Sequence, residues 1–251
     1  MKNRFGYEWS TYSEILPLYE TQFEAWTLPI TCEGWKGLSV LDAGCGTGRN
    51  SLWPLKYGAA RVTAFDVDPR TVEVARRNLA QAPNAKVEQH SIYETPYRDE
   101  FDLAFSIGVI HHLADPKLAV RKLVEAVKPG GRVLIWVYGW EGYTWAKVLV
   151  NTIRRVTCRL PLPLLKVLVY PFSILWWLFM QLPWGHPYMK QFRGAELWHV
   201  HSILFDQLLP EIANYWTEAE SKALFDGLPV ESVTATWINR GSWTVVAKKK
   251  V

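Results

Sequence analysis

The sequence predicts an α/β protein built on a doubly wound, mostly parallel seven-stranded sheet with helices on both faces. Two observations lead to this prediction. Between residues 38 and 138, short apolar segments alternate with amphipathic ones, which is typical of a parallel sheet covered on both sides. Near the C-terminus, Val230–Trp237 and Ser242–Lys248 have the pattern of two further strands, joined by a turn at Asn239-Arg240-Gly241.

Five strands are expected in the alternating region. Each is short and largely apolar, as strands buried on both faces are. Their predicted ranges are Leu38–Ala43, Arg61–Phe65, Lys86–Gln89, Phe101–Ile107 and Arg132–Tyr138.

The helices between these strands carry start and stop signals. One helix is expected over Asn50–Tyr57. Two more begin at Asp68-Pro69 and Asp115-Pro116, because Asp is favoured at the N-cap and Pro at the first helical position. Pro129-Gly130-Gly131 is expected to end the second of these. A last helix is predicted over Glu218–Phe225.

The chain is expected to form one domain with an insertion. Its 251 residues, of which 49% are hydrophobic and 21% charged, can bury one good core. Residues 38–140 and 215–251 carry the strand pattern and form the predicted core. Residues 1–37 are aromatic-rich and are expected to be a helical cover, and residues 141–214 are a hydrophobic, basic insertion after the fifth strand.

Positive charge and apolar side chains concentrate in this insertion. From Gly142 to Ala195 there is no Asp or Glu but seven basic residues, a surplus larger than the formal net charge of +4 of the whole chain. Leu164–Trp184 is long enough to cross a bilayer. A single crossing would separate the last two strands from the sheet, and prolines such as Pro171 would interrupt a straight span. A transmembrane helix is therefore not expected. The basic residues are Lys147, Arg154, Arg155, Arg159, Lys166, Lys190 and Arg193.

Cysteine and histidine usage predicts neither a metal site nor secretion. Cys32, Cys45 and Cys158 show no CxxC spacing, and the six histidines show no HExxH spacing. An odd, scattered cysteine set suits a reducing compartment, and the first residues lack the apolar region of a signal peptide. We expect a cytoplasmic protein.

The segment from Asp42 to Gly48, with sequence DAGCGTG, is the most informative part of the chain. It joins the first predicted strand to a helix, and Asp66 closes the next strand. Such glycines let the backbone approach a ligand, the helix N-terminus directs N–H groups into the same space, and a carboxylate one βα unit later can grip a ribose. Asp42 would repel a pyrophosphate but favour a cationic group, so the pattern indicates S-adenosylmethionine rather than a dinucleotide.

These motifs resemble those of the class I S-adenosylmethionine-dependent methyltransferases, a Rossmann-like family. Leu41–Gly48 matches the family's first motif, and Ala64–Asp68 matches its ribose-binding segment. Ser106–Pro116 resembles the fourth-strand motif of small-molecule methyltransferases, including those of quinone biosynthesis, and Val127–Gly131 resembles the approach to the fifth strand. The resemblance implies methyl transfer with S-adenosylmethionine as cofactor and does not specify the acceptor.

Carried over position by position, the resemblance implies the contacts of the methionine portion. Gly44, Cys45 and Gly46 would form the turn that borders it, and Asp42 would lie near its amino group. Ile107 would border the sulfonium.

The resemblance also implies the contacts of the nucleoside. Asp66 would accept hydrogen bonds from both ribose hydroxyls, and Val67 would pack against the adenine. Family members usually have an acidic residue for the adenine amine, whereas this chain has His90 and Ser91 there. Ser91 or the Ile92 N–H would then serve the adenine edge.

The catalytic candidates follow from the needs of methyl transfer. A nucleophile must be held in line with an already activated methyl group. An oxygen nucleophile also loses a proton, for which histidine is the natural base at neutral pH. His111 and His112 follow the fourth strand, at the edge where open α/β sheets bind ligands, and Asp206 with His199 and His201 forms a second set. Structural roles remain the alternative. Three aromatic residues are candidates to close over the methyl group: Tyr7, Trp9 and Tyr12.

The insertion allows two compatible interpretations. It forms a lid that builds a lipophilic pocket, or it lies on an anionic membrane as a peripheral surface. We expect a lipophilic acceptor such as a quinone precursor, an isoprenoid or a lipid. The alternative acceptor is a soluble metabolite, a sugar or RNA, with the insertion as a lid or homodimer interface. Nucleic acid is disfavoured because the basic residues are interleaved with Trp-Leu clusters. The tryptophans expected at headgroup level are Trp145, Trp176, Trp177 and Trp184.

Overall fold

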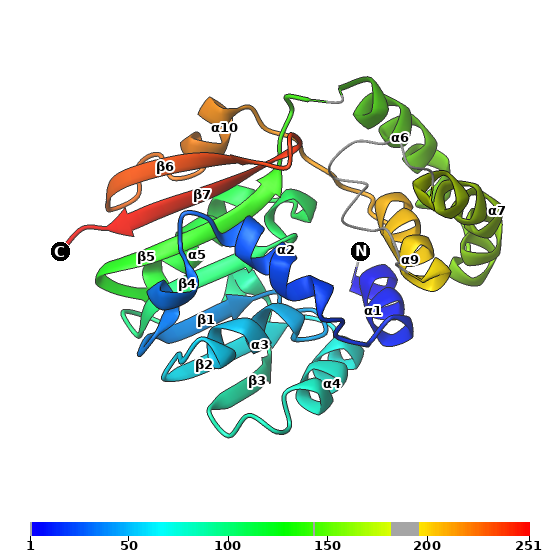
Figure 1. The fold of residues 1–251 in the computed structure, drawn as a ribbon. Coiled ribbons are helices and arrows are strands. Elements are labelled where there is room, and N and C mark those ends of the chain that lie inside the picture. Colours follow the sequence, from blue (N-terminus) through cyan, green and yellow to red (C-terminus); the bar gives the residue numbers. More distant parts are fainter. Residues whose placement is uncertain (1, 143, 182–195) are drawn as a thin grey trace.

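The computed structural model describes residues 2–142, 144–181 and 196–251. Its centre is a seven-stranded sheet with the order β3-β2-β1-β4-β5-β7-β6 (Figure 1). Strands β1 to β5 pair in parallel, and β7 runs antiparallel to both β5 and β6. The predicted fold class is confirmed. The strands are β1 (Ser39–Ala43), β2 (Arg61–Asp66), β3 (Ala85–Gln89), β4 (Phe101–Ile107), β5 (Val127–Tyr138), β6 (Val230–Ile238) and β7 (Ser242–Lys249).

The strand order places a ligand site at one position. The chain starts the sheet at β1, builds outward to β2 and β3, and then returns to add β4 and β5 on the other side. The connections therefore diverge between β1 and β4, and open α/β sheets bind ligands beyond the carboxyl ends of the strands at such a switch point.

Helices cover both faces of the sheet because successive strand residues point to opposite sides. Val40 and Leu103 pack into the core beneath one layer of helices, while Leu41 and Ala104 pack into the opposite core. The first layer contains α2 (Leu18–Thr27), the 3-10 turn η1 (Cys32–Trp35), α3 (Arg49–Lys56) and α4 (Pro69–Asn78), and the second contains α5 (Pro116–Ala126) and α10 (Glu218–Ala223).

The predicted helix starts are confirmed, and one predicted strand boundary is wrong. Asp68 and Asp115 cap α4 and α5 by accepting hydrogen bonds from the first-turn N–H groups. The fifth strand begins at Val127, not at Arg132, and contains the Pro129-Gly130-Gly131 segment expected to end the helix. Val127 already pairs with Phe101, and a register shift takes up the turn residues. The other boundaries differ by one or two residues, as helix and strand ends commonly do.

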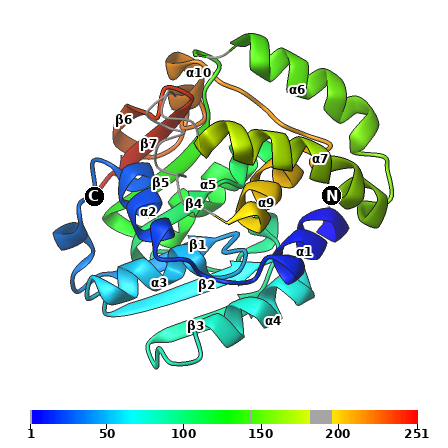
Figure 2. The same ribbon diagram turned by 45° about the vertical axis from the view of Figure 1, so that its right-hand side comes forward.

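A further group of helices stands beyond the carboxyl edge of the sheet (Figures 1 and 2). Here α1 packs against α4 and α9, and α9 packs in turn against α6 and α7. The predicted residues Trp184, Lys190 and Arg193 lie outside the described residues. This group consists of α1 (Lys2–Thr11), α6 (Thr144–Thr157), α7 (Leu162–Gln181) and α9 (Leu197–Leu208).

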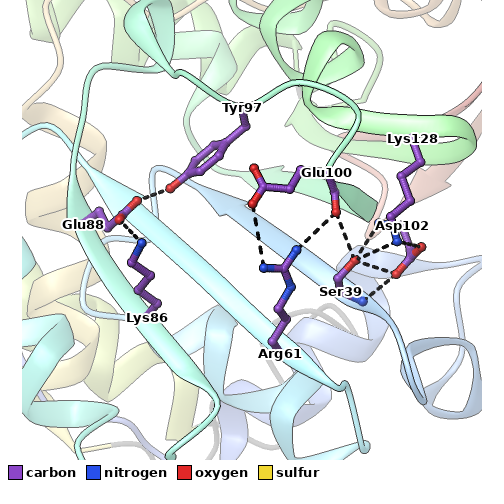
Figure 3. Close-up of polar contacts among 8 residues, drawn as sticks. All are labelled: Ser39, Arg61, Lys86, Glu88, Tyr97, Glu100, Asp102 and Lys128. Atoms are coloured by element: carbon purple, nitrogen blue, oxygen red, sulfur yellow. Dashed lines mark hydrogen bonds and ion pairs between the residues drawn. The ribbon is translucent and has the colours of Figure 1, made fainter.

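The amino edge of the sheet is held by paired polar side chains (Figure 3). Asp102 at the start of β4 accepts hydrogen bonds from the Ser39 N–H and hydroxyl, at 2.7 and 2.6 Å, and from Lys128 at 2.6 Å. Arg61 lies 3.8 Å from the Glu100 carboxylate. These contacts join β1, β2, β4 and β5 at the end opposite the expected site.

Candidate active site

A cavity of about 630 Å³ opens at the carboxyl ends of the central strands. Its floor is the glycine turn after β1 with the ends of β2 and β4, and its cover comes from α1, α2 and α9. The volume lies in the range of sites for small molecules and cofactors. The cavity therefore occupies the switch point of the sheet.

The glycine turn is fastened to the neighbouring strand by backbone hydrogen bonds. The N–H groups of Gly44 and Cys45 both donate to the Phe65 carbonyl at 2.9 Å. Gly44 has φ +80°, and a Cβ at this position would lie 2.5 Å from a methyl group of Val109. A side chain is therefore excluded on both conformational and steric grounds. The turn presents bare backbone to the cavity.

Asp66 is held on the cavity wall by two backbone donors. The Gly46 N–H donates to one carboxylate oxygen and the Asp68 N–H to the other, each at 3.1 Å. Burial raises the pKa of Asp66, and these hydrogen bonds only partly oppose the increase. The carboxylate is thus fixed in orientation, and each oxygen has further lone pairs for a ligand.

Asp42 lies at the same end of the sheet but off the cavity wall. Its side chain is buried, and its carboxylate accepts a hydrogen bond from the Ser51 hydroxyl at 2.6 Å, which joins β1 to α3. Burial raises the pKa of Asp42 to about 7. Asp42 therefore contacts Ser51 within the protein and does not line the cavity. The sequence interpretation had placed it near the amino group of the cofactor.

The other residues expected to bind the cofactor line the cavity. Cys45 and Gly46 belong to its floor, together with Asp66. Ser91 lies in the wall, and its hydroxyl oxygen also accepts the Tyr93 N–H at 3.3 Å, at the start of η2 (Ile92–Glu94). The remaining expected residues found on the wall are Gly44, Val67, Ile92 and Ile107.

The two adjacent histidines of η3 (Ile110–His112) have different surroundings. His111 is fully buried, is stacked on Tyr138 with ring centroids 3.7 Å apart, and lies outside the cavity lining. Its ring nitrogens have no hydrogen-bond partner among the described residues, and burial holds its pKa well below the usual value. This environment differs from that expected for a general base.

His112 does reach the cavity wall. Its Nδ1 lies 2.8 Å from the Ile212 carbonyl, so Nδ1 carries the proton and donates. Burial lowers the pKa of His112 to about 4. A histidine with so low a pKa accepts a proton poorly at neutral pH.

Two helices contribute cavity-lining residues at helical spacing. In each, the lining residues recur at i, i+3, i+4 and i+7, which places them on one face. Of the other predicted residues, Tyr7 packs against Phe205 and His201 lies 2.9 Å from the Ser173 hydroxyl, both away from the wall. The lining residues at this spacing are Phe5, Glu8 and Trp9 of α1 with Tyr12 directly after it, and His199, Ser202, Ile203 and Asp206 of α9, whose Gln207 also lines the cavity.

Glu8 and Asp206 meet in the cavity wall and form its acidic corner. Glu8 is 1% exposed, and its side chain lies close enough to that of Asp206 for each carboxyl group to affect the pKa of the other. Burial raises the pKa of both groups, and the Arg49 charge opposes the increase. The Asp206 charge also raises the pKa of Glu8, because two neighbouring carboxylates disfavour the charged form.

Arg49 is the cationic member of this corner. It is the first residue of α3, directly after the glycine turn. Its guanidinium lies 4.8 Å from the ring centre of Tyr19 and 5.2 Å from that of Trp9, within the range of cation–π attraction. The rings hold the guanidinium beside the two carboxyl groups.

Sequence reasoning missed Glu8 and Arg49. Both had a detectable signal. Glu8 shares a helical face with Phe5, Trp9 and Tyr12, and a single acid within an aromatic stripe is unusual enough to mark a site. Arg49 directly follows the glycine turn, but its direction depends on rings from α1 and α2 that are distant in sequence.

Residues 41–135 match a family of proteins described as "Methyltransferase domain". Ribosomal protein L11 methyltransferase from Burkholderia mallei (strain NCTC 10229) is 40% identical over 100 residues, which are 39% of this chain and 31% of that protein. An uncharacterised 37.1 kDa protein of a Streptomyces fradiae transposon is 33% identical over 111 residues, or 43% of this chain and 32% of that protein. The matches thus span about a third of the length of these relatives.

Solved structures share the fold over most of the chain. Magnesium protoporphyrin IX methyltransferase from Synechocystis PCC 6803, solved with bound SAH, aligns with a TM-score of 0.55 and 12% identity, covering 93% of this chain and 84% of that one. A SAM-dependent methyltransferase from Aquifex aeolicus aligns with a TM-score of 0.52 and 14% identity, covering 94% and 90%. At these identities the likeness concerns the fold alone.

Proposed function

We propose that this chain, whose residues 41–135 belong to the class I S-adenosylmethionine-dependent methyltransferases, methylates a small lipophilic acceptor such as a quinone precursor, an isoprenoid or a lipid. The observation that carries the proposal is the composition of the cavity wall. Beyond the glycine turn it carries nine Phe, Tyr and Trp side chains, with a charged corner at Glu8, Arg49 and Asp206. Such a wall favours an apolar molecule with one polar reacting group.

The floor of the cavity fits S-adenosylmethionine, the cofactor of this family. Gly44 leaves room for a ligand at the backbone, and the two hydrogen bonds to Asp66 orient its carboxylate toward a ribose. Thr47 and Asn50 line the cavity at the start of α3, where free N–H groups favour a carboxylate. When bound, the cofactor supplies an activated methyl group on a cationic sulfur. The carboxyl groups of the wall complement that charge.

The acceptor side of the cavity is built from this chain's own helices. Trp9 belongs to α1 and Tyr12 directly follows this helix, and Trp26 of α2 packs against Trp136 of β5 with the ring centroids 4.8 Å apart. None of these except Trp136 lies near residues 41–135 in sequence, so the matched domain does not specify the acceptor. Burial of an apolar acceptor against these rings contributes about 25 cal/mol for each Å² removed from water.

The Glu8–Asp206 pair is the proposed proton acceptor. Methylation of a hydroxyl or amine releases a proton, and an effective base has a pKa near the working pH. Burial raises the pKa values of both carboxyl groups toward that range, whereas it lowers the pKa of His112 to about 4. The carboxyl pair is therefore favoured as the proton acceptor over His112 and also over His199, whose pKa burial likewise lowers to about 4. In this reading Asp206 keeps the catalytic role expected for it and Glu8 shares the role.

A matched pair of acceptors tests the lipophilic part of the proposal. Catechol and 4-dodecylcatechol carry the same hydroxyl groups and differ only in an apolar tail. We expect kcat/KM to be at least tenfold higher for the dodecyl compound, since each buried methylene contributes about 0.8 kcal/mol. Transfer of the labelled methyl group of S-adenosylmethionine measures both.

Two results would count against this proposal. Equal kcat/KM for the two catechols would assign the cavity to a soluble acceptor. If the Asp66→Ala variant transfers the methyl group at an unchanged rate at saturating catechol and low cofactor, the cavity is not the site of the reaction. The Asp226→Ala variant changes an exposed carboxylate far from the wall and serves as the control.

The same proposal places the chain in the cytoplasm. Cys32, Cys45 and Cys158 form an odd, scattered set, which suits a reducing compartment. A peripheral position on a membrane would bring the cavity close to a lipophilic acceptor. The exposed surface of α6 and α7 is the part of the chain relevant to such a position.

A further inference from the structure

The outer sides of α6 and α7 expose an unusual number of large apolar side chains. Most of the exposed large hydrophobic residues among the described ranges belong to these two helices, and Val167, Phe172 and Leu175 are 67%, 68% and 65% exposed. Soluble proteins rarely leave so large an apolar area in water unless it binds something. The exposed residues are Trp145, Val148, Leu149, Ile153, Val156, Leu164, Val167, Leu168, Tyr170, Phe172, Ile174, Leu175, Trp176, Leu178 and Phe179; this set is called the outer apolar surface.

The long helix lies flat on the protein. Within the described residues, α7 is the helix with the length and hydropathy to cross a bilayer. However, Leu165, Val169 and Ser173 recur every four residues and are buried, the first two packing with Phe205 of α9. One side of α7 is thus fixed along α9 and the opposite side faces outward, as in a helix that lies in the plane of a membrane.

The neighbouring helix is fixed in the same way. Arg154 is 4% exposed, and its guanidinium donates to the Gln207 carbonyl of α9 at 2.8 and 2.9 Å. Trp145, Leu149 and Val156 remain on the outer side of α6. Figures 1 and 2 show α6 and α7 together at the end of the molecule beyond the carboxyl edge of the sheet.

The charge of this region has one sign. Neither α6 nor α7 contains Asp or Glu, and Arg155 and Arg159 are exposed beside the outer apolar surface, with Lys166 half-buried on α7. Basic side chains around an apolar face complement anionic headgroups. A second copy of this chain docked by the same helices would place these like charges opposite one another, with no acidic side chain on either helix to pair with them.

We infer that the outer apolar surface docks onto an anionic lipid bilayer, with α6 and α7 lying in the membrane plane and Arg155 and Arg159 contacting lipid phosphates. Behind this surface, α9 carries His199 and Asp206 on its cavity side and Phe205 on its α7 side. Helix α9 therefore lies between the cavity and α7, the helix that would contact the bilayer. The inference goes beyond the proposed function, because it depends on the surface and not on the reaction.

Vesicle flotation tests the inference with the full chain. We expect the protein to float with vesicles of 70% phosphatidylcholine and 30% phosphatidylglycerol, and at least fivefold less with phosphatidylcholine alone. The variant Val167→Glu/Phe172→Glu/Leu175→Glu should lose at least tenfold in vesicle partitioning, because three carboxylates would enter the apolar and anionic contact. These positions are strongly exposed, so the fold should be unaffected.

A matched variant controls for the added charge. Thr21→Glu/Gln81→Glu/Ser232→Glu adds three carboxylates at exposed positions away from α6 and α7 and should float like the unchanged protein. Absence of flotation, or equal loss in both variants, overturns the inference. The inference is also overturned if light scattering shows a dimer that the triple α7 variant dissociates while the unchanged protein binds no vesicles. Titration with S-adenosylhomocysteine should give equal affinity for all three proteins. Flotation without methyl transfer to 4-dodecylcatechol would contradict the proposed function and leave this inference intact.

Discussion

Two aspartates at opposite ends of the central strands, the half-buried Asp102 and the buried Asp42, have pKa values shifted in opposite directions. Asp102 at the amino edge and Asp42 at the carboxyl edge each accept a serine hydroxyl at 2.6 Å. Burial acts to raise the pKa of both. At the amino edge Lys128 and Ser39 outweigh burial and lower the pKa of Asp102 to about 2, whereas burial dominates at Asp42 and raises its pKa to about 7.

The two edges of the sheet differ in how many of their carboxyl groups have a cationic partner. At the amino edge the Asp102 carboxylate is paired with the Lys128 ammonium group. The carboxyl edge holds Asp42, Asp66, Glu8 and Asp206, whose pKa values are all raised by burial. The Arg49 charge opposes the increase at Glu8, and the Arg49 and Arg154 charges oppose it at Asp206. Buried carboxyl groups with too few cations are stabilised by a cationic ligand, and perturbed pKa values gather at functional sites.

The largest effect is expected at the acidic corner. Combining Glu8→Gln with Asp206→Asn removes the proposed proton acceptor but keeps the shape of both side chains. We expect kcat to fall by about 10²- to 10⁴-fold, with the affinity for S-adenosylhomocysteine changed by less than about threefold on the same scale of effects. A pH–rate profile and calorimetric titration measure the two quantities.

The histidine beside this corner provides the comparison. His112→Asn preserves a donor for the Ile212 carbonyl and should leave kcat within about threefold of the unchanged enzyme. If the histidine variant loses the activity and the carboxyl variant keeps it, the base is His112. If the carboxyl variant loses cofactor affinity instead, the corner binds the cofactor.

The second effect concerns cofactor binding. Asp66→Ala removes a carboxylate that two backbone N–H groups orient toward the cavity. Loss of charge-assisted hydrogen bonds to two hydroxyls should weaken S-adenosylhomocysteine binding by about 10²-fold. Calorimetry measures the affinity, and Asp226→Ala should bind as the unchanged protein does. An unchanged affinity in Asp66→Ala would contradict the placement of the ribose.

The third effect lies at the amino edge and concerns stability. Asp102→Asn breaks the contact with Lys128 at 2.6 Å. The Asp102 side chain is 33% exposed, so solvent screens part of its attraction to Lys128. We expect the free energy of unfolding at pH 7 to fall by about 1 to 2 kcal/mol. Urea denaturation measures the change. Glu231→Gln at the exposed Lys248 pair should cost less than about 0.5 kcal/mol.

The pH dependence of this effect has a definite sign. The pKa of Asp102 is lower in the folded protein than its ordinary value of 3.8. Its contribution is therefore complete above pH 3.8 and is lost as the pH falls toward 2. The difference between Asp102→Asn and the unchanged protein should shrink over this interval. A constant difference would mean that the ion pair does not stabilise the fold.

The smallest effect has the opposite sign. Asp42→Asn imitates the protonated carboxyl group and keeps an acceptor for Ser51. The folded pKa of Asp42 is raised from 3.8 to about 7, so the stability of the unchanged, cofactor-free protein should fall as the pH rises from 4 to 7. The variant should gain about 1 kcal/mol above pH 7 and nothing at pH 4, because the buried amide offsets part of the relief. A gain that is independent of pH would contradict the raised pKa.

Much of the fold followed from local features. Asp68 and Asp115 were expected to cap helices and do so, because a cap needs only a few neighbouring residues. The alternation of strands and helices predicted the parallel sheet, and Asn239-Arg240 form the expected turn with positive φ angles. The start of β5 could not be predicted, since it depends on the pairing of Val127 with Phe101 of another strand.

The site divides along the same line. The glycine turn and Asp66 were recognisable because their spacing encodes the backbone approach and the carboxylate at one sheet edge. The environments of His111 and His112 were not recognisable, because burial and the Ile212 carbonyl, distant in sequence, determine their pKa values. Glu8 and Arg49 depend likewise on helices α1, α2 and α9.

The βα alternation, the helix caps and the glycine turn could be read from the amino-acid order, because each depends on neighbouring residues, and the charge of the insertion follows from its composition. The pairing of carboxyl groups with cations and the outward direction of apolar side chains on α7 could not, because they arise only when the elements pack together. Burial and charged neighbours come from elements that are distant in sequence. They lower the pKa of Asp102, which is paired with Lys128, and raise the pKa of Asp66, which faces the cavity.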